Sequence, residues 1–461
     1  MRNMGYIMMS DYTLLFIMNR TKLVCCKMPI QAAESPESQA YSQNYLIRRL
    51  SLMNSRKHSA MIVGLSAAML AGTLAGCGTS TSAAPPTKNI SDITIGTLYA
   101  GSGAYATSSL PEYAGLKFWA SQADKSGGVF VKALNKKVPI KIVAYNDQSS
   151  ATTATSLYSQ LISVNHVNVL VADFGSVLTS VAVPVAEENK MVLFDQSGTG
   201  TTFFTPNNPY IVLTSLPNSG LWPDSLAQYL IGQHYSRVAI LYDTNDFDQS
   251  QEQTLVSKLK AAGITPVYNS GVPTSTSSYS VLLNNISHAN PQAVIEFGYP
   301  NNDISFLQAL KASGTQYKMV FTVFPGQLPT LFTTSDGPSS INNIYTYPAP
   351  PLISHAHVNY GMNSSQFIAA YKKATGQSTN FLNIAGYNTG LIIQKTLETA
   401  NSLSQLSLRH AVSRFSGTIE TLDGKFQINS EGAQTGETLP VGKLTTNSAG
   451  KVSVDLLTPL S

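Results

Sequence analysis

The chain has 461 residues, enough for two or three domains of ordinary size. Charged residues make up only 12% of it, against roughly a quarter in typical soluble proteins. Residues 1–76 hold eight Lys and Arg against three Asp and Glu, which leaves 21 basic and 22 acidic residues from Cys77 onward, a net charge of −1. A body this close to neutral has no basic stripe, which argues against binding to nucleic acid.

The three cysteines all lie early in the chain, at Cys25, Cys26 and Cys77. Because none follows Cys77, the body has no disulfide framework and no thiolate metal site. A cysteine nucleophile is excluded for the same reason.

Residues 53–77 combine three features of an export signal. A basic segment at 53–58 precedes an apolar run at 61–74, which is too short for a permanent membrane span and ends in Leu74-Ala75-Gly76-Cys77. The combination resembles a bacterial lipoprotein signal, which implies cleavage before Cys77 and acylation of its thiol. We therefore expect a signal peptide over 53–76, a flexible tether over 77–90, and a lipid anchor on the outer face of the cell membrane.

Residues 1–52 fit no part of this plan. We interpret them as a non-native upstream extension, with translation starting at Met53, and the alternative is an unusually long leader. No fold is expected there.

Segment 91–200 alternates predicted strands and helices as β-α-β-α-β-α-β, which is typical of a parallel sheet with helices on both faces. The first helix is expected to start at Ser109 or Leu110, with Pro111 at its first position and Glu112 in its first turn. The predicted strands cover 93–99, 138–145, 167–172 and 191–194, and the later helices cover 151–164 and 176–189.

Two turns in this segment follow neighbouring strands. Gly175-Ser176 comes after the third strand, and Ser197-Gly198-Thr199 comes after the fourth. Both lie at the carboxyl end of a parallel strand, where open α/β sheets bind ligands. Their hydroxyls and free N–H groups near a helix start predict a site for a carboxylate.

The α/β pattern then repeats after a hinge-like segment at 216–220, which predicts a second doubly wound lobe and a ligand cleft between the two. Late helices at 364–375 and 383–401 and paired strands at 417–429 and 441–454 complete the chain. The expected fold class is α/β, with two doubly wound Rossmann-like lobes joined by a hinge. The expected boundaries are 91–215 with 345–436 for the first lobe, and 216–344 with 437–461 for the second.

The motif Gly175-Ser176, followed by VAVPVAEE at 181–188, resembles the solute-binding proteins of the branched-chain amino acid transporter class. The resemblance extends to Gly127-Gly128, to Asp147, and to the helix around 385–390, which in the family packs back on the first lobe. It implies a type I periplasmic binding protein fold, an extracytoplasmic monomer without a cofactor, and a permease of an ABC transporter as partner. It also implies that a ligand carboxylate is held by Ser176, Ser197, Gly198 and Thr199.

An aromatic set is expected to cover the ligand. Phe247 and Tyr299 follow strands of the second lobe where the family carries aromatic residues beside the ligand, and Tyr105 lies in the first loop of the first lobe. Phe324 joins them after a later strand. Planar aromatic faces bury large apolar areas, so the set favours a ligand box.

The sequence departs from the family after the strand at 318–324. Amino acid-binding members carry an acidic residue there for the ligand's ammonium group, whereas residues 323–327 read VFPGQ. Because an unpaired buried ammonium costs several kcal/mol, either Asp303 or Asp246 substitutes or the ligand is not a zwitterion. A carboxylate, or amide, with an apolar or aromatic tail then becomes the variant of the family default.

Enzyme signatures are missing from the sequence. It has no Gly-x-Ser-x-Gly elbow, no His-Glu-x-x-His and no Walker loop. Glu187 and Glu188 are expected on the surface of a helix. His355 and His357 could face the same side of an extended segment, but the sequence supplies no further ligands for a metal beside them. We therefore predict a binding protein with no catalytic residue and no metal. The alternatives are a ligand sensor for a membrane receptor and an extracytoplasmic hydrolase.

Overall fold

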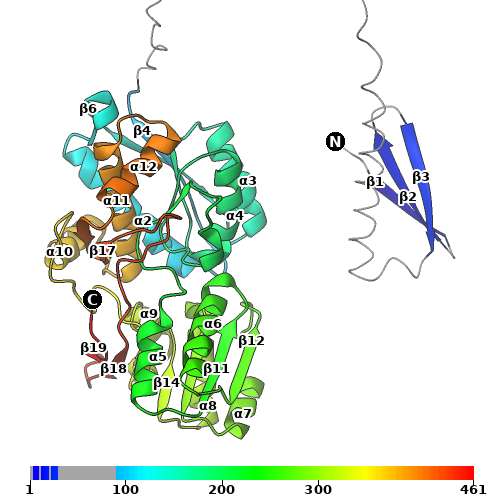
Figure 1. Ribbon diagram of the computed structural model, residues 1–461, viewed down its shortest axis with the longest axis vertical. Helices are drawn as coiled ribbons and strands as arrows, with labels where there is room; N and C mark the ends of the chain where they lie inside the picture. The colour runs from blue at the N-terminus through cyan, green and yellow to red at the C-terminus, as the bar shows by residue number, and fades with distance from the viewer. Residues whose placement is uncertain (1–3, 10–11, 20–21, 30–89, 461) are drawn as a thin grey trace, which may run out of the picture. The chain divides into compact units, whose positions relative to one another are not determined.

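The computed structural model describes residues 90–460 and three strands near the N-terminus (Figure 1). Strands β1 (Met4–Met9), β2 (Tyr12–Asn19) and β3 (Lys22–Pro29) pair antiparallel in that order. The expectation of no fold in residues 1–52 is wrong for these three segments, which are mostly apolar and contain Tyr, Ile, Phe, Thr and Val, residues that favour strands. The N-terminal unit ends at Pro85, and the predicted signal peptide, Cys77 and nearly all of the tether lie outside the described residues.

The first lobe is built on a five-stranded parallel sheet with the order β10-β9-β8-β4-β7. Helices α2 and α11 cover one face and α3 and α4 the other (Figure 1). The strands are β4 (Ile93–Tyr99), β7 (Ile140–Asn146), β8 (Val169–Val171), β9 (Leu193–Asp195) and β10 (Ile211–Leu213), with a hairpin of β5 (Val129–Val131) and β6 (Lys136–Val138). The helices are α2 (Ala106–Lys125), η2 (Lys132–Leu134), α3 (Ala151–Ser163), α4 (Gly175–Glu188) and η3 (Thr201–Phe203).

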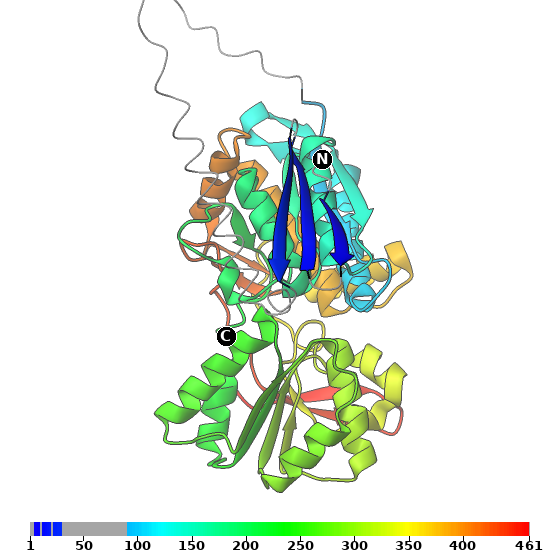
Figure 2. The same ribbon diagram turned by 90° about the vertical axis from the view of Figure 1, so that its right-hand side faces the viewer.

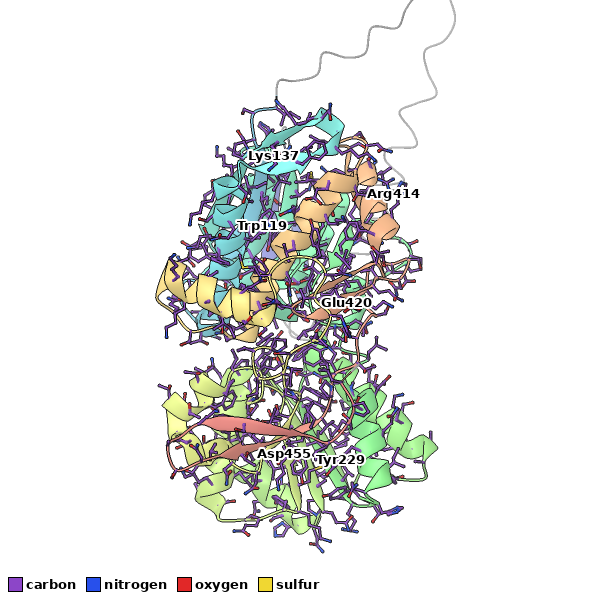
Figure 3. All side chains as sticks on the ribbon, turned by 90° about the vertical axis from the view of Figure 1, so that its left-hand side faces the viewer. Trp119, Lys137, Tyr229, Arg414, Glu420 and Asp455 are labelled. Carbon is purple, nitrogen blue, oxygen red and sulfur yellow. The ribbon has the colours of Figure 1, made fainter. Side chains whose placement is uncertain are left out.

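Later parts of the chain return to this lobe. They are α10 (Ser364–Thr375), α11 (Phe381–Thr399), α12 (Gln405–Phe415), β16 (Ile419–Thr421) and β17 (Gly424–Phe426). Trp119 of α2, labelled in Figure 3, packs in the apolar core that these elements share with the sheet. The contact of α11 with α2 confirms the expected packing of this helix on the first lobe.

The second lobe has a seven-stranded sheet with the order β12-β11-β13-β14-β15-β18-β19, in which the last two strands are antiparallel. Helices α5 and α6 lie on one face, and α8 and α9 lie on the other (Figure 2). The strands are β11 (Val238–Asp243), β12 (Tyr268–Val272), β13 (Ala293–Phe297), β14 (Met319–Phe321), β15 (Tyr345–Thr346), β18 (Gly442–Thr446) and β19 (Val452–Leu456). The helices are α5 (Pro223–Gly232), α6 (Asp246–Ala261), α7 (Ser280–His288), α8 (Pro300–Ser313), α9 (Pro329–Asp336) and η4 (Pro338–Ile341).

The chain passes between the lobes after β10, after β15 and before β18. These two doubly wound lobes confirm the predicted fold class. In the described part of the chain, no helix combines the length and the apolar character that crossing a membrane requires.

The start of α2 differs from the expectation. The helix begins at Ala106, so Pro111 lies inside it and Ser109 is not its cap. The Ser109 hydroxyl donates to the Asp173 carboxylate and accepts the Ala100 N–H, which holds Ser109 in the buried side of the helix. Glu112, expected in the first turn, lies in the second turn of the helix and is fully buried.

Candidate functional site

The turn after β8 forms the start of α4, and it lies beside the turn after β9. Gly175 has φ +76°, a conformation that favours glycine because other residues meet a steric penalty there. Ser176 and Val177 follow in the first turn of α4, where backbone N–H groups have no partner within the helix. The first turn thus presents donors and a positive dipole end.

Hydroxyl groups link the two turns. The Gly175 N–H donates to Ser197 Oγ over 3.1 Å, and the Gly200 N–H donates to Ser176 Oγ over 2.9 Å. The Gly198 N–H donates to the Asp195 carboxylate over 2.7 Å. These bonds fix the backbone of both turns, and they engage most of the polar groups that the sequence offered for a ligand.

Thr199 is the exception. Its side chain is 1% exposed, lines the cavity described below, and its Oγ1 has no hydrogen-bond partner among the residues that the structure describes. A buried hydroxyl without a partner is unfavourable by roughly 1–3 kcal/mol, so Thr199 Oγ1 is free to bond to a water molecule or a ligand group.

A small cavity of about 20 Å³, room for about one water molecule, lies where these turns face the second lobe. Aromatic rings from both lobes form most of its wall, and none of these described lining side chains carries a charge. The lining residues are Phe174, Gly175, Ser197, Thr199, Leu216, Trp222, Phe247, Tyr299, Phe324 and Phe381.

Tyr299 joins the two lobes across this cavity. The Ser176 N–H donates to its phenol oxygen over 2.9 Å. Two further bonds cross nearby: Thr202 Oγ1 donates to Asp246 over 2.7 Å, and the Asn301 amide donates to the Ala104 carbonyl over 2.9 Å. The lobes are therefore in direct polar contact around the site.

Five of the eight residues proposed from the sequence line the cavity: Ser197, Thr199, Phe247, Tyr299 and Phe324. The other three lie close by. Ser176 contacts Tyr299, Gly198 faces Thr179 behind the turn, and Tyr105 packs on the Tyr299 ring with 5.6 Å between centroids. Their roles toward a ligand stay predictions.

Sequence reasoning missed Phe174, Gly175, Leu216, Trp222 and Phe381 as lining residues. Phe174 and Gly175 directly precede the predicted Ser176, so the turn itself was the signal. Leu216 lies in the predicted hinge, and Trp222 occupies the N-cap position of α5 just after it. Phe381 is the first residue of α11 and reaches Phe324 with 6.3 Å between ring centroids, a contact that no local pattern signals.

Neither candidate partner for a ligand ammonium lines the cavity. The Asp246 carboxylate accepts two hydrogen bonds from Thr202. Asp303 is fully buried and accepts the Phe324 N–H over 2.7 Å, and burial raises the pKa of this carboxyl to about 7. Both carboxyl groups thus accept hydrogen bonds from other residues of the protein.

Comparison with known proteins agrees with this architecture. The family model described as periplasmic binding protein matches residues 92–451. The Leu/Ile/Val-binding protein homolog 8 of Brucella suis biovar 1 (strain 1330) is 22% identical over 318 residues, which is 66% of this chain and 75% of the relative.

Two solved structures share the fold. The branched-chain amino acid transporter substrate-binding protein LivJ of Streptococcus pneumoniae, in complex with isoleucine, has a TM-score of 0.65 at 17% identity and covers 80% of this chain and 100% of its own. An ABC transporter solute-binding protein from R. palustris in complex with benzoate has a TM-score of 0.67 at 14% identity, covering 80% and 97%.

These relatives are solute-binding proteins and not enzymes, which sets aside the hydrolase alternative. The match also implies an extracytoplasmic location. The chain belongs to the periplasmic binding protein family, in its type I, branched-chain amino acid-binding-like form.

Proposed function

We propose that this protein binds a small carboxylate with an apolar or aromatic tail and presents it to the permease of an ABC importer. The observation that carries the proposal is a single cavity in which uncharged aromatic walls meet the unpartnered hydroxyl of Thr199 and the start of α4. The hydroxyl and the helix N–H groups suit a carboxylate, and the rings suit its tail.

The absence of a charge among the described lining residues argues against a zwitterionic ligand. A ligand ammonium enclosed beside Phe247 and Phe324 would have no carboxylate partner, and a buried unpaired charge costs several kcal/mol. Among the similar structures, one holds isoleucine and another holds benzoate. Both ligands have a carboxylate and an apolar body, and only the first has an ammonium group.

Thermal shift followed by calorimetry tests the ligand class. The panel contains leucine with its deaminated counterpart 4-methylpentanoate, and phenylalanine with 3-phenylpropanoate and benzoate. We expect each deaminated acid to bind at least as tightly as its amino acid and to raise the melting temperature. A clear preference for leucine would assign an amino acid instead, and no binding by any carboxylate would refute the proposal.

A ligand sensor for a membrane receptor is the alternative within the binding class, because the same cavity would serve it. Uptake distinguishes the two. Deleting the gene should abolish import of the ligand if the protein serves a permease, whereas a sensor would leave import intact and remove only a response.

We also propose that the protein is held at the membrane through Cys77, on the evidence of the Leu74-Ala75-Gly76-Cys77 motif. Protein with Cys77 should partition into the detergent phase, and Cys77→Ser should remain as an uncut, unacylated precursor. Equal detergent partitioning of both forms would contradict lipid anchoring.

A further inference from the structure

The first turn of α4 is already occupied by a side chain of the protein. The phenol oxygen of Tyr299 accepts the Ser176 N–H over 2.9 Å. The ring lies directly on Gly175, where an added Cβ would come within 3.0 Å of Tyr299 Cε1 and Oη. Tyr299 thus takes a backbone donor that a ligand carboxylate at this helix start would use.

The backbone of Tyr299 is held firmly by the second lobe. Its carbonyl accepts the N–H groups of Asn302 and Asp303, each over 2.9 Å. Pro300 follows and opens α8. The hydroxyl can therefore leave the start of α4 only if the side chain turns or the lobes move apart.

The ring has aromatic neighbours from both lobes. The centroid of Tyr299 lies 5.8 Å from Phe174 of the first lobe, and 5.6 Å and 6.3 Å from Phe247 and Phe324 of the second. These contacts hold the phenol in the cavity, so the Ser176 N–H is occupied whenever the lobes meet as they do here.

We propose that Tyr299 is an internal competitor of the ligand, whose hydroxyl must be displaced from the Ser176 N–H before a carboxylate can bind there. This rests on the proposed function, since it assumes that the ligand carboxylate uses this donor. A carboxylate can displace a neutral phenol because charge-assisted hydrogen bonds are roughly twice as strong as neutral ones. Tyr299 lowers the affinity for every ligand that needs this donor, and it holds the lobes together without a ligand.

Tyr299→Phe tests the proposal, because it removes the hydroxyl and keeps the ring. Calorimetry with benzoate and 4-methylpentanoate should show affinities raised roughly 2- to 12-fold, the equivalent of one ordinary hydrogen bond. In ligand-free protein, amide exchange at Ser176 should become faster. Tyr317→Phe is the matched control: this residue lies just before β14, outside the cavity, and should change neither measurement.

An unchanged or lower carboxylate affinity in Tyr299→Phe would overturn the proposal, since the hydroxyl would then be neutral or a ligand contact. Unchanged amide exchange at Ser176 would overturn it as well. If neither protein binds any carboxylate, the proposed function fails, and the exchange measurement still decides whether the phenol occupies the start of α4.

Discussion

Thr199 and Ser176 carry the same kind of group in very different situations. Ser176 Oγ accepts the Gly200 N–H, so its hydroxyl maintains the turn. Thr199 Oγ1 is buried at the cavity, and the described residues offer it no hydrogen-bond partner. The two hydroxyls should therefore respond differently to removal, although the sequence presents them as equivalent members of one carboxylate site.

Thr199→Val should weaken binding of the preferred carboxylate by roughly 1.5–3 kcal/mol, because it removes a hydrogen bond to a charged group. Stability without ligand should stay the same or rise, since valine has the same shape and leaves no unpaired hydroxyl. Calorimetry and thermal denaturation check this. Ser176→Ala is the contrasting variant and should lower stability by about 1 kcal/mol, because it leaves the Gly200 N–H unpaired. Equal losses of stability in both variants would contradict the distinction.

At the level of elements, the contact between α2 and α11 connects the core of the first lobe to the cavity. A Cβ on Gly386 would overlap the carbonyl oxygen of Glu112, so the two backbones touch. Gly390 lies against the Trp119 ring in the same way. Because α11 begins at Phe381, the seating of this helix on α2 also sets where a cavity-lining ring lies.

Gly386→Ala should destabilise the protein by about 3 kcal/mol, because backbone atoms cannot yield to the added methyl group. Any ligand affinity should fall with it as Phe381 shifts. Thermal denaturation and calorimetry measure the two effects. Gly232→Ala is the control, since nothing lies within 4 Å of its added Cβ, and it should be neutral or slightly stabilising. A Gly386→Ala protein as stable as the control would refute the close helix contact.

Across the whole molecule, carboxyl groups are buried in both lobes with almost no cationic partner. Arg409 is the one buried cation in the described part of the chain, and it bonds to Ser413 and the Ser430 carbonyl. Burial, and next to it the Asp147 charge, raises the pKa of Asp173, and burial together with the Asp303 charge raises the pKa of Glu296. The buried acids include Glu112, Asp147, Asp173, Asp195, Asp243, Asp248, Glu296, Asp303 and Asp423.

Burial raises the pKa of Asp195 and of Asp243 to about 8 and that of Asp423 to about 6. In the unfolded chain such groups ionise near pH 4. Between these values the folded state binds more protons than the unfolded state, so the free energy of unfolding falls as the pH rises. Carboxyl groups thus make the fold most stable in acid, the reverse of the usual effect of paired carboxylates.

We expect the melting temperature to be highest near pH 4 and to decline through pH 8. Each pKa unit corresponds to about 1.4 kcal/mol, so several such groups together should lower stability by several kcal/mol over this range. Circular dichroism melts across the range measure it. A stability maximum at pH 7 would mean that these groups are ionised or solvated in the folded protein.

Glu296→Gln should flatten this pH dependence, because it removes a buried carboxyl group whose pKa is raised by burial and by the Asp303 charge. The slope of unfolding free energy against pH should become less steep, by the amount that corresponds to at most one bound proton. Stability at pH 8 should rise. Glu188→Gln, on the exposed end of α4, is the control and should leave the slope unchanged. An equal change in both variants would indicate a general charge effect.

Local patterns in the sequence correctly predicted the two doubly wound lobes, the turns at the carboxyl ends of β8 and β9, and the surface position of Glu187 and Glu188. These features follow from hydrophobic periodicity, turn residues and helix caps, which act over a few neighbouring residues. The same local signals misplaced the start of α2, because Ser109 is held there by Asp173, 64 residues further along.

Which side chains face the cavity depends on packing between segments that are distant in the sequence. Phe381 reaches it through the packing of α11 on α2, and Tyr299 meets Ser176 across 123 residues because the lobes close on each other. No local pattern predicted that Glu112, Glu296 and Asp303 are buried, since an isolated acidic residue is ordinarily a surface residue. Distant segments set the burial and the partners of each polar group, and these decide whether it binds a ligand, a proton or its own backbone.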